Sequence, residues 1–98
     1  MMTLPGQNSL QVVGAGFSQI EHQILGVIQD LDFAEQLKEI PRDLDLYDAG
    51  MSSHTSVKLM LGVEDSFDIE FPDELLERET FSSIANIAKS VEEILASG

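Results

Sequence analysis

Apolar residues recur at intervals of three and four in three separate stretches of the chain, and no stretch shows the two-residue alternation of a strand. This spacing places the apolar side chains along one face of a helix. In the last stretch, Thr80 is the expected N-cap and the helix is expected to reach about Ala96. Its apolar stripe consists of Ile84, Ile87, Ala88, Val91, Ile94 and Leu95.

The first helix is expected directly after Phe17. Ser18 and Glu21 have the spacing of a capping box, and Phe17 stands where a hydrophobic staple would. The residues after this helix are less regular, and Pro41 stops any helical extension through residues 32–40. The apolar stripe of the first helix consists of Ile20, Ile24, Val27, Ile28 and Leu31.

The middle helix is expected from about Ser53 to Phe67, followed by a short helical turn that begins at Pro72. The sum is a small all-α bundle over residues 17–98, with three main helices, one short helix and a long loop between the first two. Residues 1–16, which contain several glycines and a proline, are expected to form an irregular arm. The core stripe of the middle helix consists of Leu59, Met60, Val63 and Phe67.

Length and composition restrict what the chain can do. Its 98 residues, 43% of them hydrophobic, suffice for one small domain, and the lack of cysteine excludes disulfides and thiolate metal sites. Eighteen acidic residues against five basic ones give a net charge of −13, which argues against binding to nucleic acid or anionic membranes. We expect a monomer with basic protein partners. Since no targeting segment or bilayer-spanning run is apparent, the cytoplasm is the expected compartment.

A calcium loop is the first alternative for residues 43–54, because Asp43, Asp45 and Asp48 lie near a glycine. The calcium-binding pattern needs an acid or amide at its fifth position, glycine at its sixth and glutamate at its twelfth. These positions hold Tyr47, Asp48 and His54, so the pattern fails and no metal site is expected.

A serine nucleophile is the second alternative, because Ser53 stands beside His54. Adjacent residues of a helix point about 100° apart and do not face each other, and no nucleophile-elbow motif is present. We therefore expect no catalytic residue, with His22 and His54 on the surface. From the residues alone, Ser53 is either a helix cap or an exposed attachment point at the positive end of the helix dipole.

The stretch "DAGMSSHTSVKLMLGVEDSFDIEFPDELL" resembles the core of acyl carrier proteins and peptidyl carrier domains. Those families have a Gly-x-x-Ser turn that opens a helix, followed by a Phe-Asp-x-Glu-x-Pro-Asp motif, which "FDIEFPDE" matches closely. "TFSSIANIAKSVEEIL" is similar to the last helix of the family, so the resemblance covers about residues 17–96.

The resemblance implies that Ser53 is modified and that Gly50, Met51 and Ser52 form the turn before it. In the family, a separate magnesium-dependent phosphopantetheinyl transferase moves 4′-phosphopantetheine from coenzyme A onto this serine. The thiol of the arm then holds an acyl or aminoacyl group as a thioester, which partner enzymes load and unload. The chain is therefore expected to be a carrier and a substrate rather than an enzyme.

Two positions depart from the pattern of fatty-acid carriers. The residue before the modified serine is usually Asp and is Ser52 here, and the residue after it is usually Leu and is His54 here. An acidic contact to the transferase is in doubt at Ser52. The chain resembles more closely a subgroup of stand-alone carriers with Gly-x-Ser-Ser turns. Ligases resembling aminoacyl-tRNA synthetases load these carriers with amino acids.

Charge along the middle helix also departs from the family. Residues 53–63 contain no acid and one base, Lys58, whereas residues 64–79 contain eight acids and Arg78. We therefore expect the basic surfaces of partner enzymes to bind the end of this helix and the loop after it. The acids expected in this contact are Glu64, Asp65, Asp68 and Glu70. The residues expected in a less charged contact around the arm are His54, Val57 and Leu61.

One further alternative stays open at this point. An acidic helical adaptor with a carrier-like fold, never modified and not catalytic, would account for the same helices and the same charge. His54 and Ser52, the two departures from the family pattern, favour this alternative. It differs from a carrier in one testable respect, the attachment of an arm to Ser53.

Overall fold

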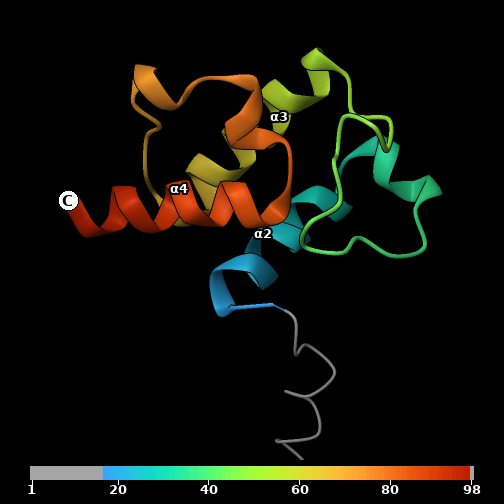
Figure 1. The fold of residues 1–98 in the computed structure, drawn as a ribbon, viewed down its shortest axis with the longest axis horizontal. Coiled ribbons are helices and arrows are strands. Elements are labelled where there is room, and N and C mark those ends of the chain that lie inside the picture. Colours follow the sequence, from blue (N-terminus) through green and yellow to red (C-terminus); the bar gives the residue numbers. More distant parts are fainter. Residues whose placement is uncertain (1–16, 98) are drawn as a thin grey trace, which may run out of the picture.

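The computed structural model describes residues 17–97, so the arm expected over residues 1–16 lies outside the described part. Within residues 17–97 the fold is all-helical and contains no strand (Figure 1). The α-helices are α2 (Gln19–Gln29), α3 (Ser53–Phe67) and α4 (Ile84–Ser97), and the short 3₁₀ helices are η1 (Asp32–Gln36), η2 (Asp73–Leu75) and η3 (Arg78–Phe81). The expected all-α bundle with a long loop between its first two main helices is confirmed. No helix in the described residues is long and apolar enough to cross a membrane.

The start of α2 has the expected capping box. The Ser18 hydroxyl accepts a hydrogen bond from the Glu21 amide at 3.1 Å, and the Ser18 amide donates to Glu21 Oε1 at 2.9 Å. The Phe17 ring packs edge-on against the His22 ring, with 5.4 Å between centroids, which is the position of the hydrophobic staple. These contacts fix where α2 begins and how the chain enters it.

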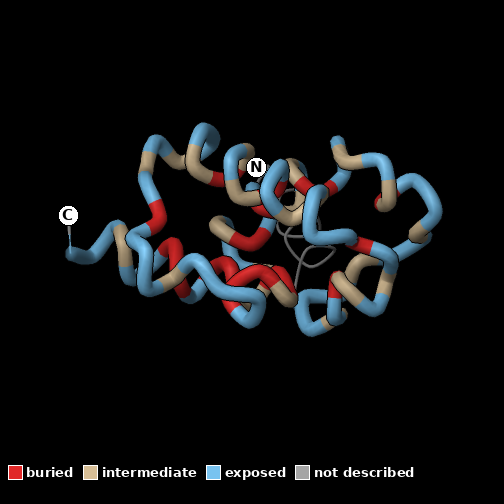
Figure 2. The backbone as a smooth tube through the Cα atoms, turned by 90° about the horizontal axis from the view of Figure 1, so that it is seen from above, coloured by how far each residue is buried: buried red, intermediate tan, exposed pale blue. Residues whose placement is uncertain are grey.

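The core lies where α2 packs against α3 and α4 (Figure 2). Gly62 allows α2 and α3 to approach closely, because a β-carbon at this position would lie 2.7 Å from Val27 Cγ1. The largest fully buried side chains are Ile24, Ile28, Leu46, Leu59, Val63, Ile84, Ile87 and Val91. All but Leu46 come from the apolar stripes of the three helices, so the helical spacing of the sequence predicted the core well.

The expected start of the last helix at Thr80 is wrong. Thr80 is buried inside η3, and α4 begins at Ile84, where the Ser83 hydroxyl accepts a hydrogen bond from the Asn86 amide at 3.1 Å. The physical reason is Phe81, whose buried ring packs edge-on against Phe71 at 5.1 Å between centroids. The chain therefore turns tightly to bury this ring before the α-helix starts.

Two smaller expectations also need correction. Pro72 stands at the N-cap position of η2 with an extended backbone, rather than at the first helical position, and η2 is a 3₁₀ helix of 3 residues. Leu95 belongs to the apolar spacing of α4 but is 48% exposed. It lies near the end of the helix, where the side chain finds too few neighbours to be buried.

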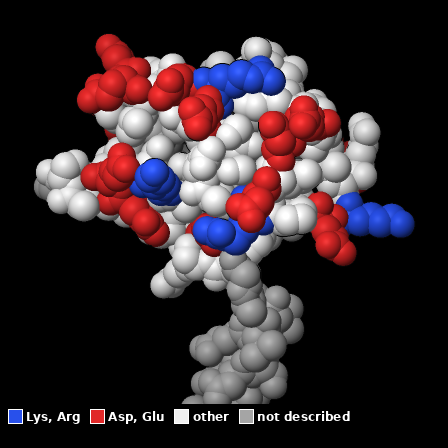
Figure 3. Space-filling model, in the orientation of Figure 1, with Lys and Arg blue, Asp and Glu red and all other residues white. Residues whose placement is uncertain are grey.

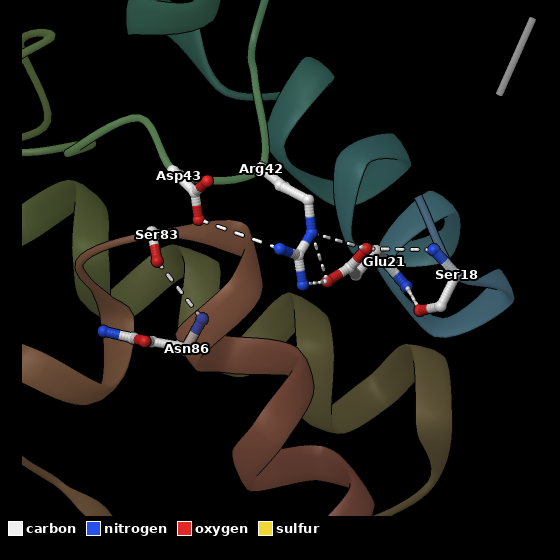
Figure 4. A network of polar contacts seen from close by, with 6 residues as sticks. All are labelled: Ser18, Glu21, Arg42, Asp43, Ser83 and Asn86. Carbon is white, nitrogen blue, oxygen red and sulfur yellow. Dashed lines mark hydrogen bonds and ion pairs between the residues drawn. The ribbon is translucent and has the colours of Figure 1, made fainter. Parts of the chain in front are cut away.

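The long loop between α2 and α3 is anchored to the helices at defined points (Figure 4). Arg42 binds the buried Glu21 carboxylate through a 2.6 Å contact, and the Arg42 carbonyl accepts a hydrogen bond from the Ala85 amide of α4. The Leu46 side chain is fully buried, and its amide donates to the Ser82 carbonyl at 2.7 Å. Because the loop is fixed in this way, the residues that lead into α3 have a defined position.

Electrostatics around Glu21 follow from this contact. The Arg42 guanidinium, which hydrogen-bonds the Glu21 carboxylate, lowers the pKa of that carboxyl below its ordinary value, although burial opposes the shift. Within residues 17–97, every buried side-chain nitrogen or oxygen has a hydrogen-bond partner. The pair therefore joins a buried carboxylate of α2 to a partly exposed arginine of the loop.

Candidate attachment site

The turn before α3 is built from a glycine and a buried methionine. Gly50 has φ of +121°, a conformation that residues with a β-carbon rarely adopt. The Met51 side chain is 3% exposed and belongs to the core, and the Met51 amide donates to the Leu46 carbonyl at 3.0 Å. The residues expected to form the turn therefore fix the position at which α3 starts.

The two adjacent serines have different roles in the structure. Ser52 is the N-cap of α3, because its hydroxyl accepts a hydrogen bond from the Thr55 amide at 3.1 Å and lies 3.1 Å from Thr55 Oγ1. Ser53 is the first residue of the helix and is exposed, and among the described residues its hydroxyl makes no hydrogen bond. Capping is thus complete without Ser53, whose hydroxyl remains available for chemistry.

A groove of about 550 Å³ opens beside Ser53, between α3 and the segment that contains η3. On one side the Arg78 guanidinium lies over the Tyr47 ring, 3.9 Å from its centroid, an arrangement that is typical of a cation–π contact. The residues that line the groove are Tyr47, Ser53, Ser56, Val57, Met60, Leu76, Glu77, Arg78 and Phe81. Most of its surface is apolar, and Arg78 and Glu77 are its charged members.

The three residues expected in a less charged contact around the arm are all exposed. Val57 and Leu61 are 51% and 53% exposed, and His54 is also exposed. Val57 lies one turn of α3 beyond Ser53 and Leu61 lies one turn further. Exposed apolar side chains at this spacing form a stripe that a partner protein can cover.

The expected acidic residues do not all face solvent. Asp65, Asp68 and Glu70 are exposed, whereas Glu64 is half-buried and its carboxylate accepts a hydrogen bond from the Phe71 amide at 2.9 Å. Asp68 also ends α3 in a left-handed conformation with φ of 57°. Acidic side chains form several clusters on the face seen in Figure 3, and some of these clusters lie beside basic side chains. Glu64 therefore has an internal role, and the other three remain candidates for partner binding.

Sequence reasoning missed the residues that form the far wall of the groove. Tyr47 comes from the long loop, and Leu76, Arg78 and Phe81 follow α3 by nine or more positions. No local pattern brings these segments together with Ser53. The one available signal was Arg78 itself, a single base within the acidic residues 64–79.

The three aspartates of the calcium-loop alternative precede Gly50 in the long loop. Asp43, Asp45 and Asp48 are exposed, and Asp45 Oδ1 accepts hydrogen bonds from the Tyr47 and Asp48 amides. Across residues 17–97, no three acidic or histidine side chains lie close enough together to hold a metal ion. Asp45 instead stabilises the turn that leads toward Gly50.

Comparison with known proteins identifies the family. The family model described as "Phosphopantetheine attachment site" matches residues 23–91. The chain is 57% identical over 56 residues to an aminoacyl carrier protein of Agrobacterium fabrum, an alignment that covers 57% of this chain and 68% of the relative. It is 31% identical over 77 residues to an acyl carrier protein of Akkermansia muciniphila, which covers 79% of this chain and 94% of that protein.

A solved structure agrees with the sequence relatives. The chain is similar to the carrier protein from Agrobacterium tumefaciens in a crystal structure with an engineered Bradyrhizobium japonicum glycine:carrier protein ligase and ATP. The TM-score is 0.69 at 42% identity, over 78% of this chain and 100% of that one. These relatives are carriers rather than catalysts. The chain therefore belongs to the phosphopantetheine-attachment family of acyl and aminoacyl carrier proteins, whose cofactor is 4′-phosphopantetheine.

Proposed function

We propose that this chain receives a 4′-phosphopantetheine arm on Ser53 and carries an amino acid on it between partner enzymes. The observation that supports this most directly is the contrast between the two serines: Ser52 caps α3, and Ser53 is exposed with an unused hydroxyl. A phosphodiester on Ser53 would also stand at the N-terminus of a helix of 15 residues, where negative charge is stabilised.

The residues of this chain fit such a group at Ser53. Ser53 Oγ would hold the arm through a phosphodiester, formed when it displaces 3′,5′-ADP from coenzyme A and its proton passes to the transferase. Gly50 and Met51 hold the start of α3 in place, so the hydroxyl is presented in one direction. When bound, the arm supplies a terminal thiol that holds an acyl or aminoacyl group as a thioester, which a cysteine-free chain cannot do itself.

An amino acid is the cargo that the relatives favour. The relative at 57% identity is an aminoacyl carrier protein, and the structural relative at 42% identity is bound to a glycine:carrier protein ligase. The first 11 residues of α3 contain no acid and expose Val57 and Leu61, which favours a loading enzyme with an apolar contact near the arm. We therefore propose that an aminoacyl-tRNA-synthetase-like ligase loads this carrier.

Intact-mass measurement after co-expression with a broad-specificity phosphopantetheinyl transferase tests the attachment. We expect one arm on the wild-type chain, one arm on Ser52→Ala and none on Ser53→Ala. Peptide fragmentation should place the arm on Ser53. An unmodified wild-type chain would favour the adaptor alternative, and an arm on Ser52 would refute the assigned position.

Loading assays test which cargo the carrier accepts and whether the loading enzyme contacts the exposed apolar residues of α3. Modified protein is offered glycine, other amino acids, malonyl groups and fatty acids with the corresponding ligases, and we expect amino acids to be accepted best. Leu61→Glu should lower kcat/KM for loading by about tenfold or more, because it places a charge in an apolar contact. Leu95→Glu is the matched control, since Leu95 is exposed to a similar degree on α4. Equal effects of the two variants would exclude a specific contact at Leu61.

A further inference from the structure

We propose that Lys58 is a specificity-determining residue of this carrier, which selects a loading enzyme that places a carboxylate against the exposed face of α3. This inference rests on the proposed function, because it concerns the enzyme that loads the arm. It adds a charge requirement to the apolar contact at Val57 and Leu61. The partner it fits is an aminoacyl ligase whose contact surface is apolar around one Asp or Glu side chain.

Lys58 lies in the middle of the face that the loading enzyme is proposed to cover. Its side chain is exposed, and its neighbours one turn away on the surface of α3 include His54 and Leu61. Val57 directly precedes it and is 51% exposed. A protein that covers the exposed apolar side chains near Ser53 therefore also covers the Lys58 side chain.

The ammonium group of Lys58 has no acidic partner in the described part of the chain. Among residues 17–97, the ion pairs involve Arg42, and no carboxylate lies within ion-pair distance of Lys58. The residues three and four positions away from Lys58 on either side are His54, Thr55, Leu61 and Gly62. None of them is an acid, so no helical neighbour can pair with the ammonium group. Lys58 therefore presents a free positive charge on α3.

Covering this charge restricts which partner can bind. An ammonium group that loses its water needs a hydrogen-bonding acceptor in exchange, and a carboxylate is the acceptor that also pairs with its charge. A Lys or Arg side chain of the partner at the same place would repel it. The four-carbon stem of Lys58 can pack on apolar surface, so the side chain also fits an otherwise apolar contact. Lys58 therefore favours an enzyme with an acidic residue near the arm.

The order of charges along α3 also sets the direction in which the enzyme lies. Asp65 is exposed and follows Lys58 by seven residues, which places it on the same face about 10 Å further along the helix axis. An enzyme with a carboxylate against Lys58 and a basic side chain against Asp65 is attracted in one orientation and repelled in the reverse one. An enzyme whose carrier-binding surface is basic throughout loses this match at Lys58.

Loading kinetics of the carrier with its arm attached test the proposal. Intact mass first verifies the arm, and the probe is the ligase that loads the wild-type chain fastest with an amino acid. A failure of the proposed function is therefore seen before any variant is measured. Lys58→Gln should lower kcat/KM for loading by about threefold to tenfold, and Lys58→Glu should lower it further. The change should lie mainly in KM, because the contact forms on binding.

The matched control is Lys89→Gln, which removes one exposed positive charge from α4 and changes the net charge by the same amount. It should leave loading unchanged, and circular dichroism verifies that all variants remain helical. A second probe is a ligase that loads fatty acids onto acyl carrier proteins. With this enzyme Lys58→Glu should raise kcat/KM above the wild-type value, the opposite of its effect with the aminoacyl ligase.

Three results would overturn the proposal. The first is unchanged loading of Lys58→Glu by the aminoacyl ligase, and the second is equal effects of Lys58→Gln and Lys89→Gln. The third is a kcat/KM of Lys58→Glu with the fatty-acid ligase that is unchanged or lower than that of the wild type, because Lys58 would then not discriminate between partners.

Discussion

The starts of α2 and α3 are both capped by a serine, but they use their polar groups differently. At α2, Ser18 and Glu21 bind each other, and Glu21 is buried and bound to Arg42, so its polar groups are used within the molecule. At α3, Ser52 completes the cap and the next residue, Ser53, is exposed with an unused hydroxyl.

This difference separates a structural helix start from one that is available for chemistry. A helix needs one cap, and a second polar residue beside that cap adds little to stability. Ser53 is exposed at the end of a fixed turn, which is the position that the proposed attachment requires. The comparison predicts that substitutions at α2 change stability, whereas substitution of Ser53 changes modification.

The largest effect on stability is expected at α2. Glu21→Gln keeps the acceptor for the Ser18 amide but removes the charge that binds the partly exposed Arg42 side chain, and it should lower the free energy of unfolding by about 1.5 kcal/mol. Urea denaturation at pH 7 measures the change. If the stability lost were smaller than in an ordinary surface substitution, the contact between Glu21 and Arg42 would contribute little. The structural role assigned to the start of α2 would then fail.

The pH dependence of the same variant sharpens this result. Arg42 lowers the pKa of Glu21 in the folded state, so the stabilisation is complete above the unfolded pKa of about 4.3 and is lost as pH falls through the folded pKa. The stability difference between wild type and Glu21→Gln should therefore be largest near pH 7 and shrink below about pH 4. A constant difference across this range would contradict the assigned cause.

A smaller effect is expected at the cap of α3. Ser52→Ala leaves the Thr55 amide without its side-chain acceptor, which should cost about 1 kcal/mol. Thermal and urea unfolding measure this change, and Ser52→Asp, which restores a capping oxygen, should recover it. If Ser52→Ala were neutral, Ser52 would not be the cap that distinguishes the two serines.

The smallest effect is expected at Ser53. Because its hydroxyl makes no hydrogen bond within residues 17–97, Ser53→Ala should change the free energy of unfolding by less than about 0.5 kcal/mol. The same variant is expected to lose modification completely. A large loss of stability would mean that Ser53 is structural, and the contrast between the two helix starts would fail.

Local patterns predicted most of this fold but not the whole site. The bounds of α3 follow from its apolar stripe and its serine cap, both of which lie within the helix itself. The start of α4 could not be predicted from local sequence, because Thr80 and Ser83 are both good caps. Packing between Phe71 and Phe81 determines which of the two precedes the helix. That contact joins residues ten apart, outside the range of a helical pattern.

The groove beside Ser53 is even further from what local sequence patterns can predict. It joins Tyr47, Ser53 and Arg78, which come from three segments that only the tertiary fold brings together. Ser53 itself is predicted as the attachment residue from a family motif, and the residue before it departs from that motif. The structure gives Ser52 a definite task, since serine and aspartate are both good helix caps.

The buried Met51 has a consequence for protein engineering. Its side chain holds the chain in the core one residue before the cap, and Gly50 supplies the bend that precedes it. The surface of the loop further upstream could be redesigned, or exchanged for that of another carrier, without turning the serine toward a different partner. Inserting one residue between Met51 and Ser53 would instead separate the buried methionine from the cap of α3, so the turn could no longer hold the start of the helix as it does here.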